Sequence, residues 1–425
     1  MEISDALYQT YGQILREELI EAMGCTEPVS LAYAGATARA ILGGLPERVV
    51  LGVSGNIVKN VKSVNVPNLG GLKGLQAAVS GGIVAGDETG VLQVLAHITA
   101  EQRTQIADFL EKCPIEVHVL ETGSAFEIDL TLFRAEESAR IHMKDYHTNI
   151  VALEKNGVSI SDTPKAESTP QAARSNRDGL TVRGILEYAS MVNISEIQDL
   201  LDLQIADNMA ISSEGLSHKW GACIGSVLSE SRSPDLRLRC SAAAAAGSDA
   251  RMSGCELPVV ICSGSGNQGI TTSVPVIVYA RQTGCSQERL YRALVVSNLL
   301  TIHQKQYIGA LSAFCGAVSA GASAGAAIAW MDTGSYEAVC HTLTNALGIA
   351  SGMICDGAKP SCAAKIATAV QAGLLGYDMY RNASAFHGGE GILADEIETT
   401  IQNVGKVGRE GMRETDREIL RLMTC

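Results

Sequence analysis

The spacing of apolar and polar residues predicts two unlike halves of the chain. In the first half, apolar residues at helical intervals predict an amphipathic helix over residues 5–22 and a buried, Ala-rich helix from Val29 to Leu42. Helical patterns also cover residues 72–85 and 100–112. Runs in which apolar and polar residues alternate predict strands at 47–58, 115–120, 125–133, 139–143 and 149–153. We therefore expect an antiparallel sheet with helices on one side.

Beyond about residue 180 the strand signals nearly vanish. Residues 161–178 are mostly Ser, Pro, Lys, Glu and Asn, which is typical of an exposed linker. The helical patterns that follow are rich in Ala and Gly and fall near 181–192, 194–213, 217–229, 234–247, 267–283, 286–299, 306–331, 335–350, 360–376 and 394–422.

The predicted fold class is α+β, with an antiparallel-sheet α+β domain followed by a large all-α domain of Ala/Gly-rich helices. The expected division is a set of N-terminal helices at 1–45 that pack on the all-α domain, an α+β domain at 46–160, a linker at 161–180 and the all-α domain at 181–425.

Composition excludes two classes of partner. The formal net charge is −13 and Lys and Arg form no cluster, so neither a nucleic-acid backbone nor an anionic membrane is expected to bind. The N-terminus lacks the basic and apolar stretches of a signal peptide, and the apolar stretch from Cys315 to Trp330 is too short to span a bilayer. We expect a cytoplasmic protein that binds a small molecule. The sequence leaves open whether the chain forms a homo-oligomer.

Three of the twelve cysteines are candidate metal ligands. A cytoplasmic chain does not use twelve cysteines as a disulfide framework, so metal binding or catalysis becomes a better explanation for some of them. Cys355 and Cys362 flank a Gly and a Pro, and Cys315 lies upstream in Phe-Cys-Gly-Ala-Val. Three thiolates that converge suit an iron–sulfur cluster or zinc. The alternative is that they are buried core residues, since cysteine packs like a small apolar side chain.

A fourth cysteine, Cys25, falls between two predicted helices in Gly24-Cys25-Thr26-Glu27-Pro28. The glycine ends one helix and the proline suits the first turn of the next. A helix N-terminus favours the thiolate, so we expect it to lower the pKa of Cys25. The alternative is a small residue packed in a tight turn.

Several polar, Gly-rich segments are candidate ligand loops. Residues 54–60 and 65–71 are dense in Asn and Gly, and Cys262–Ile270 precedes a predicted helix, where backbone N–H groups suit a carboxylate or phosphate. Each of these segments also reads as an ordinary turn. The polar stretch 303–307 precedes another predicted helix. His387 stands beside three glycines, either as a loop residue or as an acid/base that faces a ligand.

The chain resembles the L-cysteine desulfidase family from end to end. The resemblance rests on Gly24–Pro28, on the loop with Asn56, Lys59 and Asn60, on Val66-Pro67-Asn68, and on the segments around the three cysteines. The half from Cys262 to Cys362 also resembles the α chain of iron–sulfur L-serine dehydratases. In that family the last two cluster cysteines are more widely spaced, and Ser-Ser-His-Thr replaces Gly-Cys-Thr-Glu-Pro.

The resemblance implies a lyase that converts L-cysteine to pyruvate, ammonia and hydrogen sulfide with a [4Fe-4S] cluster. It implies Cys315, Cys355 and Cys362 as cluster ligands and Cys25 as the acid/base. The substrate-binding residues that it implies, with those drawn from the polar loops, are Thr26, Glu27, Asn56, Asn60, Ser265, Gly266, Asn267, Gln268 and His387.

The sequence leaves three other functions open. The same site suits L-serine, and a non-catalytic iron or redox sensor is a rival of another class. A structural zinc site is the third, although no fourth Cys or His stands at zinc-finger spacing. The terminal Cys425 is a candidate cap for an open iron, since a cysteine takes this place in some related serine dehydratases.

Overall fold

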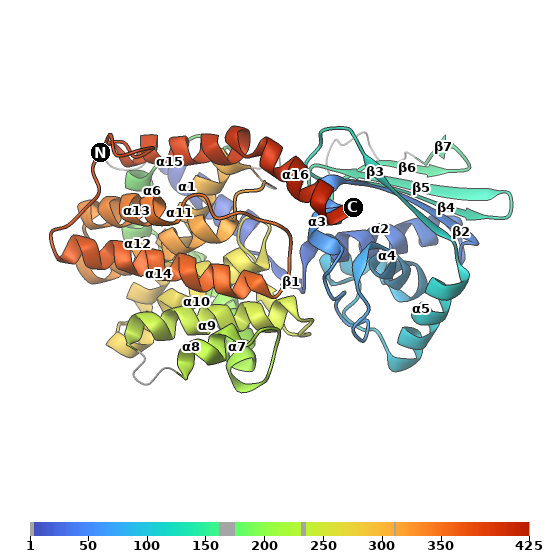
Figure 1. The fold of residues 1–425 in the computed structure, drawn as a ribbon, viewed down its shortest axis with the longest axis horizontal. Coiled ribbons are helices and arrows are strands. Elements are labelled where there is room, and N and C mark those ends of the chain that lie inside the picture. The colour runs from blue at the N-terminus through green and yellow to red at the C-terminus, as the bar shows by residue number, and fades with distance from the viewer. Residues whose placement is uncertain (1–3, 161–174, 231–234, 310–311, 425) are drawn as a thin grey trace.

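The computed structural model describes residues 4–160, 175–230, 235–309 and 312–424. It consists of two lobes that lie side by side (Figure 1), one a sheet covered by helices and the other a larger bundle of helices. The predicted α+β class is therefore confirmed. Most of the expected linker, residues 161–174, lies outside the described residues, as does Cys425.

The α+β lobe is built on a six-stranded sheet with the order β3–β2–β4–β5–β6–β7. Its strands are β2 Arg48–Ser54, β3 Ile115–Leu120, β4 Glu127–Arg134, β5 Glu137–Lys144, β6 Ile150–Lys155 and β7 Val158–Ser159. One pair departs from the expected antiparallel arrangement, because β2 and β3 run parallel. A parallel pair requires a crossover, and the helices between residues 55 and 112 supply it.

One face of this sheet packs against helices and the other carries polar residues. Along β4, Ile128, Leu130 and Leu132 are fully buried in a core shared with α2 (Thr26–Leu42), α4 (Gly74–Ala85) and α5 (Ala100–Lys112). Between them Asp129 accepts two hydrogen bonds from Arg140 on the opposite face. Successive side chains of a strand point to opposite faces, so the alternating pattern specified which face is buried.

The helical lobe packs closely because small residues line the contacts between its helices. Its long helices are α7 Gln198–Ser217, α9 Leu236–Met252, α10 Gly266–Thr283, α11 Gln287–Ile308, α12 Gly316–Thr333, α13 Tyr336–Ala350 and α14 Ser361–Arg381. Two shorter helices are α6 Val182–Met191 and α8 Ile224–Ser229. The polar stretch 303–307 lies inside α11, and the helix expected over 306–331 begins only at Gly316.

Substituting Gly325 by alanine is expected to lower the free energy of unfolding by about 1–3 kcal/mol, as overpacking typically does. A Cβ on Gly325 would come within 2.4 Å of the Gly373 backbone, where α12 meets α14. Urea unfolding followed by circular dichroism measures the change. The control is Gly90→Ala, whose Cβ would meet nothing closer than 3.9 Å. Equal unfolding midpoints for the two variants would contradict this account of the packing.

The two lobes divide the N-terminal segment 1–45 between them. α1 (Asp5–Glu18) buries Tyr11, Ile14 and Leu15 in the core of the helical lobe, whereas α2 belongs to the core of the α+β lobe. Between them β1 (Glu21–Met23) pairs with β8 (Pro258–Val260) of the helical lobe. The chain therefore passes from one lobe to the other immediately before Cys25.

The C-terminal helix also connects the lobes (Figure 1). In place of one helix over 394–422, the chain forms α15 (Ile397–Lys406), a π-helical turn (Val407–Gly411) and α16 (Arg413–Thr424). α16 reaches α3 (Gly55–Val61), the short helix that occupies the expected loop 54–60. There Asp416 accepts a hydrogen bond of 2.5 Å from the buried Lys59.

Asp416→Asn is expected to loosen α16 from the α+β lobe. The substitution removes the carboxylate that pairs with the Lys59 ammonium, whose side chain is only 2% exposed. A buried polar group that loses its partner costs about 1–3 kcal/mol. We therefore expect amide hydrogen exchange in α16 to accelerate about 10-fold or more, since helix opening costs less.

Glu414→Gln is the matched control. Glu414 lies on the same helix, but both Glu414 and its partner Arg417 are exposed. Unchanged exchange in Asp416→Asn, or equal acceleration in both variants, would show that the Lys59–Asp416 pair does not hold α16 in place.

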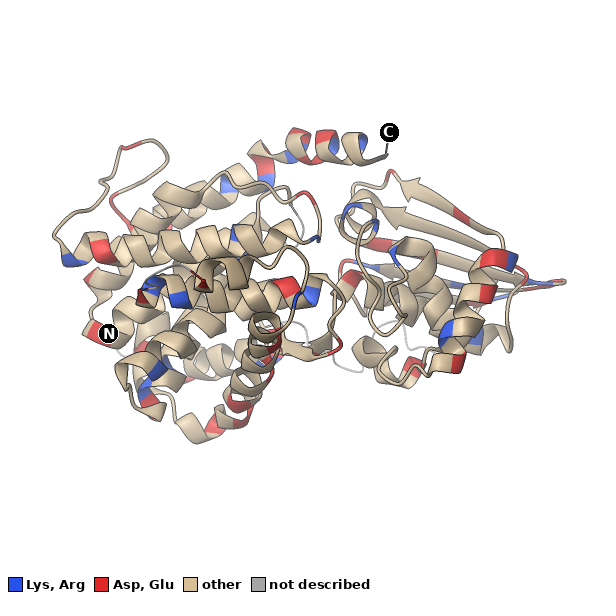
Figure 2. Ribbon diagram, turned by 60° about the horizontal axis from the view of Figure 1, so that its bottom comes forward, with Lys and Arg blue, Asp and Glu red and all other residues tan. Residues whose placement is uncertain are grey.

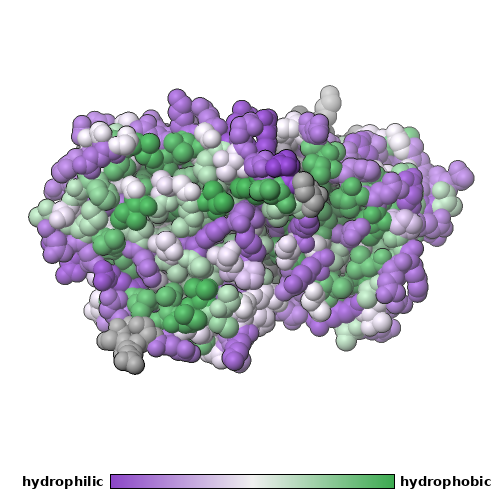
Figure 3. All heavy atoms as spheres, viewed as in Figure 1, coloured by the Kyte–Doolittle hydropathy of each residue, from purple (hydrophilic) through white to green (hydrophobic). Residues whose placement is uncertain are grey.

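The outer surface mixes charges and apolar residues. Acidic and basic residues are interspersed along the outer helices (Figure 2), and apolar residues on the face of Figure 3 lie between polar ones. Within the described ranges, no helix has the length and apolar character needed to cross a membrane.

Candidate active site

A cavity of about 180 Å³ lies between the two lobes. The α+β lobe contributes the start of α2, the helix α3 and residues 145–147 of the β5–β6 hairpin. The helical lobe contributes the starts of α10, α12 and α14 with Arg251 and Lys305. The sequence-predicted residues that line the cavity are Cys25, Thr26, Glu27, Asn60, Ser265, Asn267, Gln268, Cys315, Cys355 and Cys362.

Three predicted residues do not line the cavity. Asn56 lies on α3, and its buried Oδ1 atom has no partner among the described residues. Gly266 packs against the Arg251 guanidinium, where a Cβ would come within 2.3 Å of Nε. His387 is exposed in the loop before α15, and its backbone N–H donates to the Glu390 carboxylate.

Cys25 occupies the N-cap of α2 and is only 3% exposed. The turn before it requires glycine, because Gly24 has φ +63° and a Cβ there would lie 2.1 Å from the Pro67 ring. The Gly24 carbonyl accepts a hydrogen bond of 2.7 Å from Arg251 Nη2, so a residue of the helical lobe holds this turn of the α+β lobe in place.

The pKa of Cys25 is shifted in the direction opposite to the prediction. Burial raises the pKa to about 12, while the nearby Arg251 guanidinium opposes this by favouring the thiolate. Glu27 and Cys362 raise it further by their negative charge when ionised. The helix N-terminus alone led us to expect a lower pKa, but desolvation of a fully enclosed thiolate outweighs it.

A short backbone pairing places two of the other cysteines side by side. The Cys315 N–H donates to the Met353 carbonyl at 3.0 Å, and the Cys355 N–H donates to the Ala313 carbonyl at 2.6 Å. Cys362 follows in the first turn of α14 and faces the Gly357 carbonyl, with Sγ at 3.6 Å from that oxygen. Two segments distant in sequence, one with Cys315 and one with Cys355 and Cys362, thus bring three cysteines to the lining of the cavity.

The cysteine loop also touches the other lobe. A Cβ on Gly357, which has φ +97°, would lie 2.2 Å from the Lys59 carbonyl oxygen of α3. Only glycine permits both this backbone conformation and this approach. Asp356 organises the same loop by pairing with Lys359 and Lys365. Although burial alone would raise the pKa of Asp356, these two ammonium groups lower it to about 2.

The three cysteines form a donor set of sulfur atoms alone, which suits an iron–sulfur group or zinc. Among the described residues, no three Cys, His, Asp or Glu side chains lie in the arrangement that holds a single metal ion. Burial, together with the neighbouring Cys355, raises the pKa of Cys315 to about 12. Neighbouring buried thiolates require compensating positive charge, which a bound iron–sulfur group would supply.

Four helix N-termini face the cavity. Cys25, Ser265 and Cys315 are the N-caps of α2, α10 and α12, and Cys362 lies in the first turn of α14. The N-terminal end of a helix carries partial positive charge and free N–H groups. Together they make the cavity favourable for thiolates and for a carboxylate.

Glu27 lies at the centre of a hydrogen-bond network in the lining of the cavity. Its carboxylate accepts from Asn60 Nδ2 at 2.9 Å and from Thr26 Oγ1 at 3.1 Å. The Thr26 hydroxyl also lies 3.3 Å from the Gly264 carbonyl of the helical lobe. A carboxylate held in this way suits the ammonium group of a small ligand.

The loop before α10 presents amide groups. Asn267 Oδ1 accepts a hydrogen bond of 3.2 Å from Arg251 Nη1. Gln268 lies against Gly316, directly after Cys315, and its buried Oε1 atom has no hydrogen-bond partner within the described chain. Gln268 is thus free to bind a molecule that enters the cavity.

Sequence reasoning missed Arg251 and Lys305. Arg251 ends the Ala-rich helix α9 and is 5% exposed, so a lone arginine after a run of small buried residues was the available signal. Lys305 is 8% exposed on α11. The polar stretch 303–307 was noted in the sequence. Because it was expected to precede a helix as a loop, the burial of Lys305 was not predicted.

Comparisons with known proteins identify the family of the chain. The model of the serine dehydratase alpha chain family matches residues 90–421, which include the three cysteines but not Cys25. A UPF0597 protein of Desulfitobacterium hafniense is 50% identical over 423 residues, covering 100% of this chain and 98% of the relative. Relatives from Finegoldia magna and Treponema denticola, also UPF0597 proteins, are 47% and 42% identical, covering 98% and 100% of this chain and 99% of each relative. The chain therefore belongs to the serine dehydratase alpha chain family.

Proposed function

We propose that this chain is an iron–sulfur lyase that converts L-cysteine to pyruvate, ammonia and hydrogen sulfide. The observation that carries the proposal is that Cys25, from one lobe, lines the same cavity as Cys315, Cys355 and Cys362 from the other. Membership in the serine dehydratase alpha chain family supports elimination from a small amino acid. The motif Gly24–Pro28, which resembles that of cysteine desulfidases, supports cysteine as the substrate.

Cys315, Cys355 and Cys362 would hold the cluster, which we take to be [4Fe-4S]. With three protein ligands, such a group supplies an open iron that acts as a Lewis acid toward the leaving sulfur. The helix N-termini at Cys315 and Cys362 stabilise the thiolates that it requires.

The remaining residues bind the substrate and move its proton. The Glu27 carboxylate accepts hydrogen bonds from the substrate ammonium, while the start of α10, with Asn267 and Gln268, donates to its carboxylate. Cys25, as the thiolate that the Arg251 guanidinium favours, accepts the α-proton. Burial opposes this thiolate, so Cys25 depends on the Arg251 guanidinium to act as the base.

The elimination balances in atoms and electrons. The α-C–H bond breaks, its electron pair forms the C=C bond, and the β-C–S bond breaks to release hydrosulfide. The product, aminoacrylate, tautomerises to an imine, which water hydrolyses to pyruvate and ammonia. The overall reaction consumes one water molecule for each cysteine.

A second candidate, dehydration of L-serine, is favoured by the description of the matched family. The same residues serve this reaction, with hydroxide leaving in place of hydrosulfide. The experiment is to purify the chain without air, record its visible absorbance and iron content, and assay pyruvate and sulfide from L-cysteine beside pyruvate from L-serine. Equal amounts of pyruvate and sulfide from cysteine support the proposal. Pyruvate from serine alone assigns the second candidate, and a chain that binds no iron refutes both.

A further inference from the structure

Lys305 is a buried cation on the cysteine side of the cavity. It lies near the end of α11, is 8% exposed and lines the cavity with Cys315 and Cys355. Within the described parts of the chain, no ion pair and no side-chain hydrogen bond joins Lys305 to another residue. Its neighbours are bound elsewhere, since His303 pairs with Glu398 and Gln304 donates to Ser323.

The other cations that line the cavity or adjoin the cysteine loop have partners of their own. Lys59 pairs with Asp416, and Arg251 donates to the Gly24 carbonyl and to Asn267. Lys359 and Lys365 share Asp356. Of these cations, Lys305 is the one that has neither an ion pair nor a side-chain hydrogen bond within the described residues, whereas Arg251 is held by two neutral groups.

An ammonium group in this setting is unfavourable unless an anion enters the cavity. Burying an unpaired charge costs several kcal/mol, and accordingly burial lowers the pKa of Lys305. The groups that oppose this shift are Cys355 and Cys315, which raise its pKa when they are thiolates. The thiolates of Cys315 and Cys355 are thus the source of negative charge that favours a charged Lys305.

Two charged regions can be distinguished along the cavity. Cys25 is under the influence of Arg251, Glu27 and Cys362, which marks the region we assign to substrate. Lys305 is under the influence of the other two cysteines, Cys315 and Cys355. Because Lys305, Cys315 and Cys355 line the same cavity, we expect an anionic group bound by these two cysteines to face Lys305.

We propose that Lys305 is the counter-cation of the iron–sulfur group that Cys315 and Cys355 would hold. This inference rests on the proposed function only in requiring that the group binds. A positive charge next to a thiolate-ligated cluster stabilises the added electron of the reduced state and strengthens retention of the group. Lys305 is thus a positioning and tuning residue, not a group that exchanges a proton with substrate.

The test compares Lys305→Met, Lys305→Arg and the surface control Lys112→Met in the full chain, reconstituted without air with iron and sulfide. Lys112 is a suitable control because its side chain is 75% exposed. Three quantities are measured: iron and sulfide per chain, the rate of iron loss to a chelator, and the reduction potential from a titration followed by electron paramagnetic resonance.

For Lys305→Met we expect iron loss about 10-fold faster or more, as when a residue that supports a metal ligand is removed, and a more negative reduction potential. Lys305→Arg keeps the charge and should lie near the wild type in both measurements. Lys112→Met should be unchanged.

Two results would overturn the proposal while the proposed function stands. One is that the wild type holds iron and the Lys305→Met variant loses it at the same rate and has the same reduction potential. The other is that the rate of iron loss and the reduction potential are equal but the KM of Lys305→Met is raised, which assigns Lys305 to the substrate carboxylate. A wild type without iron overturns this inference and the proposed function together, whereas a cluster-bearing chain without lyase activity overturns only the function.

Discussion

Replacing Cys25 by serine is expected to lower kcat by about 10²–10⁴-fold, the usual contribution of a general acid or base. Serine preserves the shape of the residue at the N-cap of α2, but its hydroxyl cannot supply a base at neutral pH. The iron and sulfide content should match the wild type, because Cys25 lies in the α+β lobe and is not one of the three proposed ligand cysteines. Steady-state pyruvate formation and iron analysis on the same anaerobic sample measure both quantities.

Cys113→Ser provides the control for this substitution. Cys113 is also buried and lies in the α+β lobe, but it packs in the core of the sheet and does not line the cavity. It should keep kcat within about twofold, since surface and core changes away from the reacting atoms act mainly on stability. A Cys25→Ser variant with wild-type kcat would remove Cys25 from the mechanism and favour a sensor or a different base.

Cys362→Ala should abolish activity and most of the bound iron. Its thiol lies in the first turn of α14, on the wall that Cys315 and Cys355 share, and two thiolates cannot replace three. Loss of a residue that only supports a metal ligand already costs about 10–100-fold in affinity, so loss of a ligand is expected to cost more. Iron and sulfide analysis after anaerobic reconstitution tests this directly.

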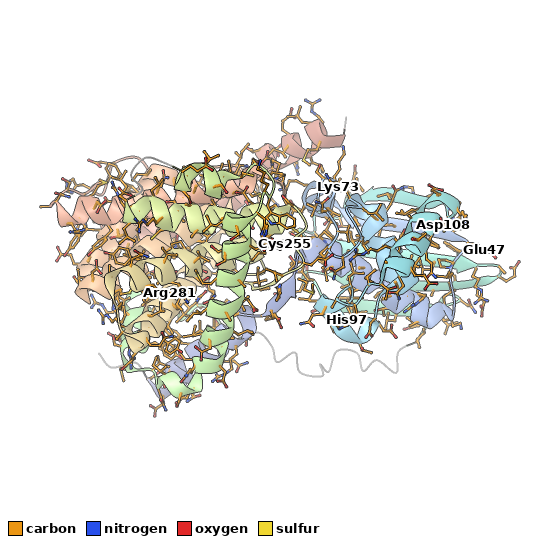
Figure 4. The ribbon with its side chains drawn as sticks, turned by 90° about the horizontal axis from the view of Figure 1, so that it is seen from below. Glu47, Lys73, His97, Asp108, Cys255 and Arg281 are labelled. Carbon is orange, nitrogen blue, oxygen red and sulfur yellow. The ribbon has the colours of Figure 1, made fainter. Side chains whose placement is uncertain are left out.

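Cys255→Ala is the matched control. Cys255 is 5% exposed and lies on the side of the helical lobe that faces the α+β lobe (Figure 4), but it is not among the residues that line the cavity. This variant should bind iron like the wild type. If Cys362→Ala binds as much iron as Cys255→Ala, Cys362 is a core residue and the proposed ligand set is wrong.

Local patterns in the sequence carried much of the fold. The alternation along β4 specified its buried face, because a strand exposes every second side chain to the same side. The helices α5 and α13 were predicted within one residue of their ends, since apolar spacing and capping residues act over a few positions. The start of α14 was predicted equally well, but the helix continues to Arg381, five residues beyond the predicted end. The candidate cysteines and the loop before α10 were also visible, because their residue types are unusual in these contexts.

Other features depended on contacts between distant segments. The parallel pairing of β2 with β3 follows from a crossover, which a strand pattern does not encode. The polar segment 54–60 became the helix α3, held by α16 from the far end of the chain. The prediction of a low pKa for Cys25 was wrong for the same reason. It considered the helix N-terminus, which lowers the pKa, but not the burial of the thiol, which raises it.

By itself, the sequence determined which residue types are available for chemistry and part of the local structure around them: four candidate cysteines, one of which, Cys25, lies in a short motif between two predicted helices. The tertiary structure decided which of these residues meet, because only the packing of two lobes defines a shared cavity. It brought Arg251 to the Cys25 turn and buried Lys305 beside the cysteines, while leaving His387 exposed. The physical reason is that burial and charge pairing are properties of the space around a side chain, which residues far apart in sequence create together.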